Sequence, residues 1–193
     1  MSNLKILFLD IYKKEGFRIN KDVNGGFGTG NNYIGGFFTK LLAKYQKESI
    51  FWPPIYFAST MGVVEKLGNH CKYSTNLKDA HNGFDVFILS SSIVACETEI
   101  KAINYLKFFK LPILVIGPFA STCPEKYIQQ GANVLIGEPD TSIMSNSEIL
   151  SQLTTKSKII YPSTKQVKLE DLPIPSWENI FKNKKCIMGF LGT

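Results

Sequence analysis

The sequence predicts an α/β protein built on a doubly wound, Rossmann-like sheet of five parallel strands with helices on both faces. Short, continuous apolar runs recur along the chain and end in small or polar residues, which is typical of parallel strands buried on both faces. Segments with helical periodicity separate most of these runs. Strands that alternate with helices in this way favour a parallel sheet with right-handed crossovers.

The strands are predicted from their apolar runs, taken in chain order. The run that starts at Leu4 ends in Asp10, and the strongest run ends in three serines. The five predicted strands cover residues 4–10, 70–74, 85–92, 112–117 and 133–138. Residues 159–161 also fit a short strand at an edge of the sheet.

The helices are predicted from apolar side chains that recur every three or four residues and from the residues that end them. Ile55, Ala58 and Met61 share one face of a helix that Gly68 ends, and Gly131 ends another. The predicted helices cover residues 37–45, 55–67, 97–109, 124–130 and 141–153, and residues 77–82 fit a connecting turn or a short helix.

The composition favours a cytoplasmic protein without membrane contacts. The chain has 193 residues, a net charge of +6 and a single arginine, Arg18. Because the lysines are scattered and arginine dominates base and phosphate recognition, this charge indicates a solubilising surface rather than nucleic-acid binding. No apolar run approaches the length of a membrane span, and the first residues lack the features of a signal peptide.

The sequence carries no complete catalytic or metal-binding motif. Neither a GxSxG nor an HExxH pattern is present, and His70 and His81 lie in turn regions without a partner at ligand spacing. Glu138 and Asp140 form an acid pair without a supporting partner. Four cysteines are spaced too widely for a zinc or cluster site, and we expect them to be reduced: Cys71, Cys96, Cys123 and Cys186.

A glycine-rich segment, residues 24–36, follows the first predicted strand. It matches neither the phosphate-binding P-loop nor the GxGxxG pattern, and it begins too far after the strand for a dinucleotide fingerprint. We interpret it as a flexible or partner-facing insert whose aromatic residues pack on a neighbouring surface.

Small and polar residues follow three of the predicted strands. In open α/β sheets, ligands bind beyond the carboxyl ends of the strands. Small residues let a ligand approach the backbone, and serine hydroxyls donate or accept hydrogen bonds. The predicted ligand site consists of Ser90, Ser91, Ser92, Gly117, Pro118, Gly137 and Glu138.

Several stretches of the chain follow one another in the order of a known cofactor-binding domain. The stretch from Val115 to Ser121 reads VIGPFAS, and the stretch from Gly131 to Asp140 reads GANVLIGEPD. They resemble the GGPH turn and the GAD and GE(G/P)E turns of the cobalamin-binding domain of radical S-adenosylmethionine enzymes. Upstream, residues 53–58 and 66–71 are similar to its PPxxLA and LxxxGHxV stretches. Residues 169–177 resemble the linker that precedes the radical core, and residues 188–193 the strand before its cluster-binding cysteines.

The resemblance implies a cofactor site and a division of the chain. Residues 1–156 would form the cobalamin-binding domain, and residues 157–193 a linker toward a radical core outside this chain. The iron–sulfur cluster and S-adenosylmethionine would bind only in a longer parent, where cobalamin would serve methyl transfer or a radical rearrangement. The cofactor-binding residues would be Asp10, Tyr12, Ser90, Ser91, Ser92, Gly117, Pro118, Phe119, Gly137 and Glu138, with the serines bonding the nucleotide tail.

The chain departs from the cobalamin pattern at three positions. Tyr12 occupies the place where related cobalamin domains carry the histidine that binds cobalt, so no lower histidine ligand is expected. Ile116 replaces the first glycine of the glycine pair, and Phe119 stands where histidine is common. These departures leave two alternatives open. One is a degenerate domain that acts as a scaffold or recognises a substrate. The other is an unrelated α/β transferase that uses the glycine-rich segment and Glu138.

Overall fold

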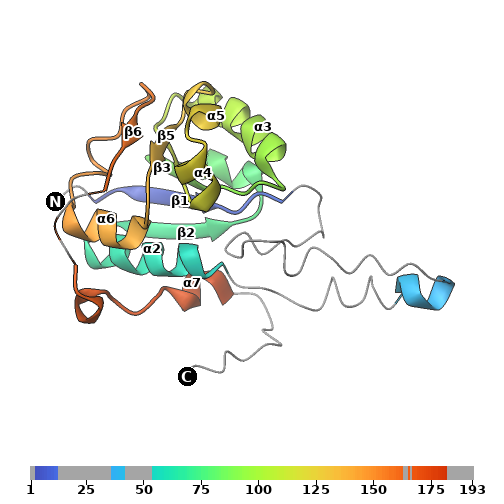
Figure 1. Cartoon of the computed structure of the whole chain (residues 1–193), viewed down its shortest axis with the longest axis horizontal. Coiled ribbons are helices and arrows are strands. Elements are labelled where there is room, and N and C mark those ends of the chain that lie inside the picture. Colours follow the sequence, from blue (N-terminus) through green and yellow to red (C-terminus); the bar gives the residue numbers. More distant parts are fainter. Residues whose placement is uncertain (1–2, 13–35, 42–53, 163–164, 166, 182–193) are drawn as a thin grey trace.

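The protein is an α/β domain with a single sheet of parallel strands (Figure 1). The computed structural model describes residues 3–12, 36–41, 54–162, 165 and 167–181. The strands are arranged in the order β2-β1-β3-β4-β5-β6, and every neighbouring pair is parallel. Their bounds are Lys5–Leu9 for β1, His70–Ser74 for β2, Val86–Ser90 for β3, Ile113–Ile116 for β4, Asn133–Leu135 for β5 and Ile159–Ile160 for β6.

Helices cover both faces of the sheet, as the sequence predicts. The α-helices are α2 (Ile55–Lys66), α3 (Cys96–Leu106), α4 (Pro118–Thr122), α5 (Glu125–Ile128), α6 (Pro139–Ser145) and α7 (Trp177–Phe181). Three 3₁₀ helices are also present among the described residues: η1 (Leu77–Asn82), η2 (Lys107–Phe109) and η3 (Leu169–Asp171). Residues 37–41 are helical as well, whereas the rest of the predicted helix 37–45 lies outside the described residues.

Alternate residues of the central strands divide the core into two layers. Ile6 and Phe8 of β1 pack with residues of α2, α6 and α7 on one face. Leu7 and Leu9 pack with residues of α3, α4 and α5 on the other. This two-residue alternation places apolar side chains on both faces, which explains why the strands are continuous apolar runs rather than alternating ones.

The structure corrects the predicted number of strands from five to six. Ile159 and Ile160 pair with β5, and the amide groups of Val134 and Ile136 donate to Lys158 and Ile160. This strand belongs to the residues that the sequence assigns to the linker. The sequence predicts residues 159–161 only as a possible short edge strand. Two partly exposed isoleucines are too short an apolar run to be counted with the five longer ones.

One predicted helix is shorter than expected, and one short helix was not predicted. The helix predicted over residues 141–153 is much shorter, because α6 ends at Ser145 and Asn146 adopts a non-helical backbone. Asn146 accepts a hydrogen bond from the amide of Glu148, and such side chain–backbone bonds compete with helical ones. Conversely, α4 begins one residue after β4, with Pro118 at its first position. Proline is tolerated there because the first amide of a helix has no hydrogen-bond partner within the helix.

The segment before and within α7 packs along α2. The amide of Ser176 donates to the carbonyl of Ala58 at 2.9 Å, and the ammonium group of Lys66 donates to the carbonyl of Asp171 at 2.8 Å. Ile180 is only 2% exposed and belongs to the core on that face of the sheet. Residues 167–181, which we call the docked segment, are therefore packed against the domain. A continuation toward a radical core stays a prediction, and residues 182–193 lie outside the described residues.

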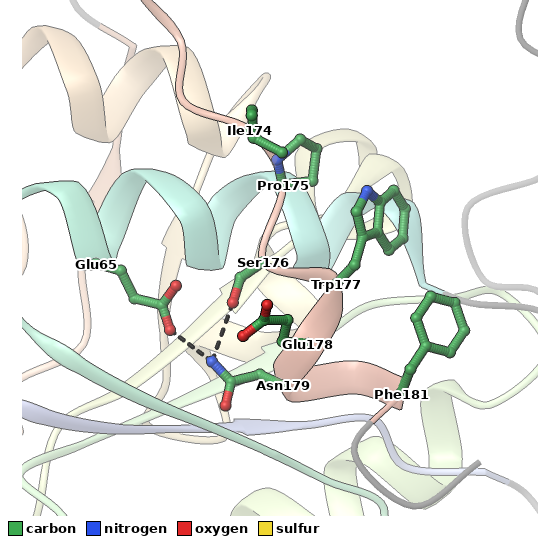
Figure 2. Close-up of a pocket in the computed structure, with 8 residues that line it drawn as sticks. All are labelled: Glu65, Ile174, Pro175, Ser176, Trp177, Glu178, Asn179 and Phe181. Carbon is green, nitrogen blue, oxygen red and sulfur yellow. Dashed lines mark hydrogen bonds between the residues drawn. The ribbon is translucent and has the colours of Figure 1, made fainter.

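A pocket of about 880 Å³ lies where the docked segment meets α2 (Figure 2). Glu65 of α2 accepts a hydrogen bond from the side-chain amide of Asn179 at 2.6 Å, and that amide also donates to Ser176. The rings of Trp177 and Phe181 are stacked, with centroids 5.9 Å apart. The docked segment is thus held at one side of the pocket by the bond from Asn179 to Glu65, and at the other side Trp177 and Phe181 pack against the core.

The close approach of the docked segment depends on Gly62 in the middle of α2. A Cβ atom at this position would lie 2.5 Å from the carbonyl oxygen of Ile174. Alanine favours a helix over glycine by about 1 kcal/mol, so Gly62→Ala would be stabilising if the docked segment were absent. We expect the opposite, a loss of roughly 1–3 kcal/mol in the free energy of unfolding, measured by urea denaturation.

Ser59→Ala, on the same helix, is the matched control and is expected to change stability by less than about 0.5 kcal/mol. Limited proteolysis would locate the effect, because the docked segment of Gly62→Ala should be cut faster. A more stable Gly62→Ala protein with unchanged cleavage would contradict the docking.

Candidate ligand site at the carboxyl ends of the strands

The candidate site lies at the edge of the sheet where β1 and β3 end. From β1 the chain crosses to β2 on one side, and it then returns to β3 on the other side of β1. Parallel sheets bind ligands at such a reversal, because the connections diverge there and leave an opening between the strand ends. Asp10 follows β1 and Ser90 ends β3, so the structure places two predicted site residues at this point.

Asp10 forms a buried polar cluster directly below the reversal. Its side chain is 2% exposed and accepts hydrogen bonds from the hydroxyls of Tyr12 at 2.7 Å, Tyr73 at 3.0 Å and Ser90 at 3.4 Å. Burial, and next the charge of Asp10, raise the pKa of Tyr73 well above its usual value, so its hydroxyl stays a donor. The structure therefore brings together three of the predicted site residues: Asp10, Tyr12 and Ser90.

Tyr73 is a member of this cluster that reasoning from the sequence missed. It lies in β2, where it is the register partner of Phe8 in β1. The sequence does contain a hint of this role. Tyr73 lies near the end of a predicted strand, and the hydroxyl of a buried tyrosine needs a hydrogen-bond partner. Recognising it required the knowledge that β2 is adjacent to β1.

Ser91 joins the ends of β3 and β4 rather than facing outward. Its side chain is 1% exposed, and its hydroxyl oxygen accepts the amide of Ala120 at 2.9 Å. Gly117 has φ of +117°, and a Cβ atom there would lie 2.8 Å from the same hydroxyl oxygen. The glycine predicted to let a ligand approach therefore lets two strand ends approach each other.

Ser92 is held from below by Glu99, a side chain of α3 that is fully buried. The amide and the hydroxyl of Ser92 donate to the two carboxylate oxygens of Glu99 at 3.2 and 3.0 Å. The hydroxyl of Tyr127 donates to Glu99 at 2.6 Å, and the amide of Ala95 donates to the Ser92 hydroxyl at 3.0 Å. Glu99 was not predicted from the sequence, where it is one of several charged residues in a helix.

Apolar side chains form an exposed rim above these buried polar groups. Ile93 and Val94, in the turn after β3, are 74% and 44% exposed. In the turn after β4, Pro118 is exposed and Phe119 is partly exposed. These two turns are neighbours, because Ser90 pairs with Ile116 and the amide of Ser91 donates to Ile116 at 2.8 Å. We call these four residues the rim.

The end of β5 is tied to the end of β4 and to α2. The amide of Gly137 donates to the Ser121 hydroxyl at 3.0 Å, and that hydroxyl donates to the carbonyl of Gly117 at 3.0 Å. The hydroxyl of Tyr56 donates to the carbonyl of Gly137 at 3.0 Å. The predicted residue Glu138 is exposed at this end. All predicted strand-end residues thus lie along one edge of the sheet.

The remaining predicted features lie away from this site or have structural partners. The ring of His81 is within hydrogen-bond distance of the Tyr105 hydroxyl at 2.7 Å and packs edge-on against Phe109. Cys71, Cys96 and Cys123 are free. Within the described ranges, His, Cys, Asp and Glu side chains form no group of three or more that could hold a metal ion. No helix in the described part of the chain is long and apolar enough to span a membrane.

Apart from Gly36, which is exposed, the glycine-rich segment 24–36 lies outside the described residues. The chain matches no protein-family model, no curated protein and no solved structure in the three comparisons.

The pKa of Glu138 gives a pH-dependent test of the β5 end. Partial burial and then the charge of Asp140 raise this pKa, whereas the hydroxyl of Tyr56 opposes the shift. A raised carboxyl pKa contributes stability at low pH that is lost as the pH rises through the folded-state pKa. Glu138→Gln mimics the neutral form and should therefore raise the melting temperature at pH 7. The gain should disappear below the ordinary glutamate pKa of about 4.3.

The contribution of Asp140 is tested in a double-mutant cycle. In an Asp140→Asn background, the gain from Glu138→Gln at pH 7 should be smaller, because the neighbouring charge is gone. A melting-temperature difference that does not vary with pH would rule out this electrostatic account.

Proposed function

We propose that the chain is a cofactor-binding module that holds a cobalamin at the carboxyl ends of its strands, and that it serves a radical S-adenosylmethionine enzyme in a longer parent protein. The observation that carries this proposal is the apolar rim above the β1–β3 reversal. In such a parent, bound cobalamin would supply a methyl group for transfer or take part in a radical rearrangement.

The rim suits a broad, apolar ligand surface. Ile93 is 74% exposed although isoleucine is among the residues most often buried, and the exposed Pro118 follows the strand adjacent to β3. Contiguous exposed apolar groups mark binding surfaces more often than single ones do. The face of a corrin ring is wide, flat and largely apolar, so its contact with the rim would remove apolar surface of both from water.

The buried serines do not fit the role of tail-binding residues. The hydroxyls of Ser90 and Ser92 donate to Asp10 and Glu99, and the hydroxyl of Ser91 accepts the amide of Ala120. All three serines are less than 9% exposed. In this proposal the rim makes the contacts with the ring, and the serines shape the strand ends that carry the rim.

The docked segment passes close to the first turn of α2. Ile174 lies beside Gly62 and Ser176 bonds to Ala58, so residues 174–176 run antiparallel to α2, whereas Asn179 in α7 bonds back to Glu65. The first turn of α2 lies at the strand-end edge, because Tyr56 bonds to the end of β5. The part of the docked segment around Ser176 therefore lies toward the end of the sheet that carries the candidate site.

A second candidate function is a degenerate domain that serves as a scaffold or recognises a substrate. The satisfied serine hydroxyls and the bond from Tyr12 to Asp10 favour it, since these groups already have partners within the protein. It shares the fold and the rim with the first candidate but predicts no cobalamin binding.

The experiment that separates the two candidates is a titration of the purified chain with hydroxocobalamin, followed by absorbance and calorimetry. The cofactor-binding proposal expects saturation near one cobalamin per chain. Ile93→Asp should weaken binding by about tenfold or more, because it places a charge against an apolar ring face. Phe108→Asp is the matched control, since Phe108 is 83% exposed but lies at the far end of α3 from the rim.

Binding that Ile93→Asp weakens and Phe108→Asp leaves unchanged would support the rim as the binding surface. Absence of saturable binding to the unmodified chain would overturn the proposal in favour of the degenerate domain. Equal affinities of both variants and the unmodified chain would mean that cobalamin binds elsewhere.

A further inference from the structure

Glu99 connects the two turns that form the rim. It holds the Ser92 end of the turn that carries Ile93 and Val94, through both the amide and the hydroxyl of Ser92. It also accepts the hydroxyl of Tyr127, whose ring packs edge-on against Phe119 with centroids 6.2 Å apart. A single buried side chain therefore links the turn after β3 with the turn after β4.

Stability alone does not explain a carboxylate at this position. Glu99 is 0% exposed, and the helix that carries it, α3, contributes Ala102, Ile103 and Leu106 to the core on that face. Burying a carboxylate has a large desolvation cost, and well-packed apolar residues of similar volume are often as stabilising as a buried polar group or more so. The bonds of Glu99 instead give the turn a defined geometry, since both of its oxygens accept hydrogen bonds in fixed directions.

Burial of side chains holds only part of this turn. Ala95 is 1% exposed, whereas Ile93 and Val94 are 74% and 44% exposed. Below them, the amide of Ala95 bonds to the Ser92 hydroxyl, which in turn donates to Glu99. Without the Glu99 side chain, Ser92 would lose its bonds to α3 and, through Tyr127, its link to α5, while the backbone bond between residue 99 and Ala95 would remain.

We propose that Glu99 is a positioning residue that fixes the spacing of the rim, and hence the size of the flat ligand that the rim accepts. This inference rests on the proposed function of the rim as a cofactor surface. Glu99 acts through Ser92 on one side and through Tyr127 and Phe119 on the other. It is not expected to touch the ligand, because it is fully buried beneath the turn.

Two substitutions separate the hydrogen bonds of Glu99 from its charge. Glu99→Leu keeps a similar volume but removes both acceptors, so the amide of Ser92 loses its partner. Amide hydrogen exchange of the free protein, measured by NMR, should then be about tenfold faster or more at Ser92, while central amides of β1 keep their protection. The affinity for hydroxocobalamin should fall by about tenfold, because the rim is no longer held in one arrangement.

Glu99→Gln should restore most of both properties. Its amide oxygen can accept from Ser92 and Tyr127, and its amide nitrogen can donate to the Ser92 hydroxyl oxygen. Glu97→Leu, an exposed position on the same helix, is the control and should change neither Ser92 exchange nor affinity. If Glu99→Leu does not fold, Tyr127→Phe replaces it, because it removes only the hydroxyl that links Glu99 to α5. It should lower the affinity by about threefold or more.

The two measurements distinguish failure of this inference from failure of the proposed function. Unchanged Ser92 exchange in Glu99→Leu, or unchanged affinity in a folded Glu99→Leu or Tyr127→Phe protein that binds hydroxocobalamin, would overturn the role of Glu99. Failure of the unmodified chain to bind would overturn the cofactor site and its dependence on Glu99 together. Faster Ser92 exchange in Glu99→Leu would then show only that Glu99 holds the turn.

Discussion

The parallel pairing of β1 with both β2 and β3 is the constraint on which the rest of this structure depends. β1 lies between two strands, and helices cover both of its faces. Because the connections from β1 and to β3 then leave in opposite directions, the sheet has an opening at their carboxyl ends. The positions of Asp10, of the serines after β3 and of the rim all follow from this arrangement.

At the carboxyl ends of the strands, polar side chains are buried and apolar side chains are exposed. Asp10 and Glu99 lie beneath the edge with their oxygens bonded to hydroxyl and amide donors, whereas Ile93 and Val94 lie above them in solvent. A buried carboxylate with several donors is held in one place, because each lost bond would leave a polar atom unsatisfied at a cost of about 1–3 kcal/mol. The polar layer therefore provides rigidity, and the apolar layer provides a surface for a ligand.

The docked segment shows how two short helices and the extended stretch between them become part of a fold. It packs along α2, contributes Ile180 to the core and requires a glycine in the facing helix. The docked segment therefore belongs to the packing of the domain itself.

The sequence by itself determined the elements whose signals are local. Local hydrophobic patterns mark the apolar runs around residues 86–90 and 113–116 and the buried faces of α2 and α3. The fold class and most helices and strands were therefore predictable. So was the end of the sheet at which the polar residues lie. The tertiary structure alone decided the strand order, the partners of each serine and the roles of Tyr73, Glu99 and Gly62. These depend on contacts between residues far apart in the chain, such as Ser91 with Ala120 and Gly62 with Ile174, which no local pattern of hydrophobicity encodes.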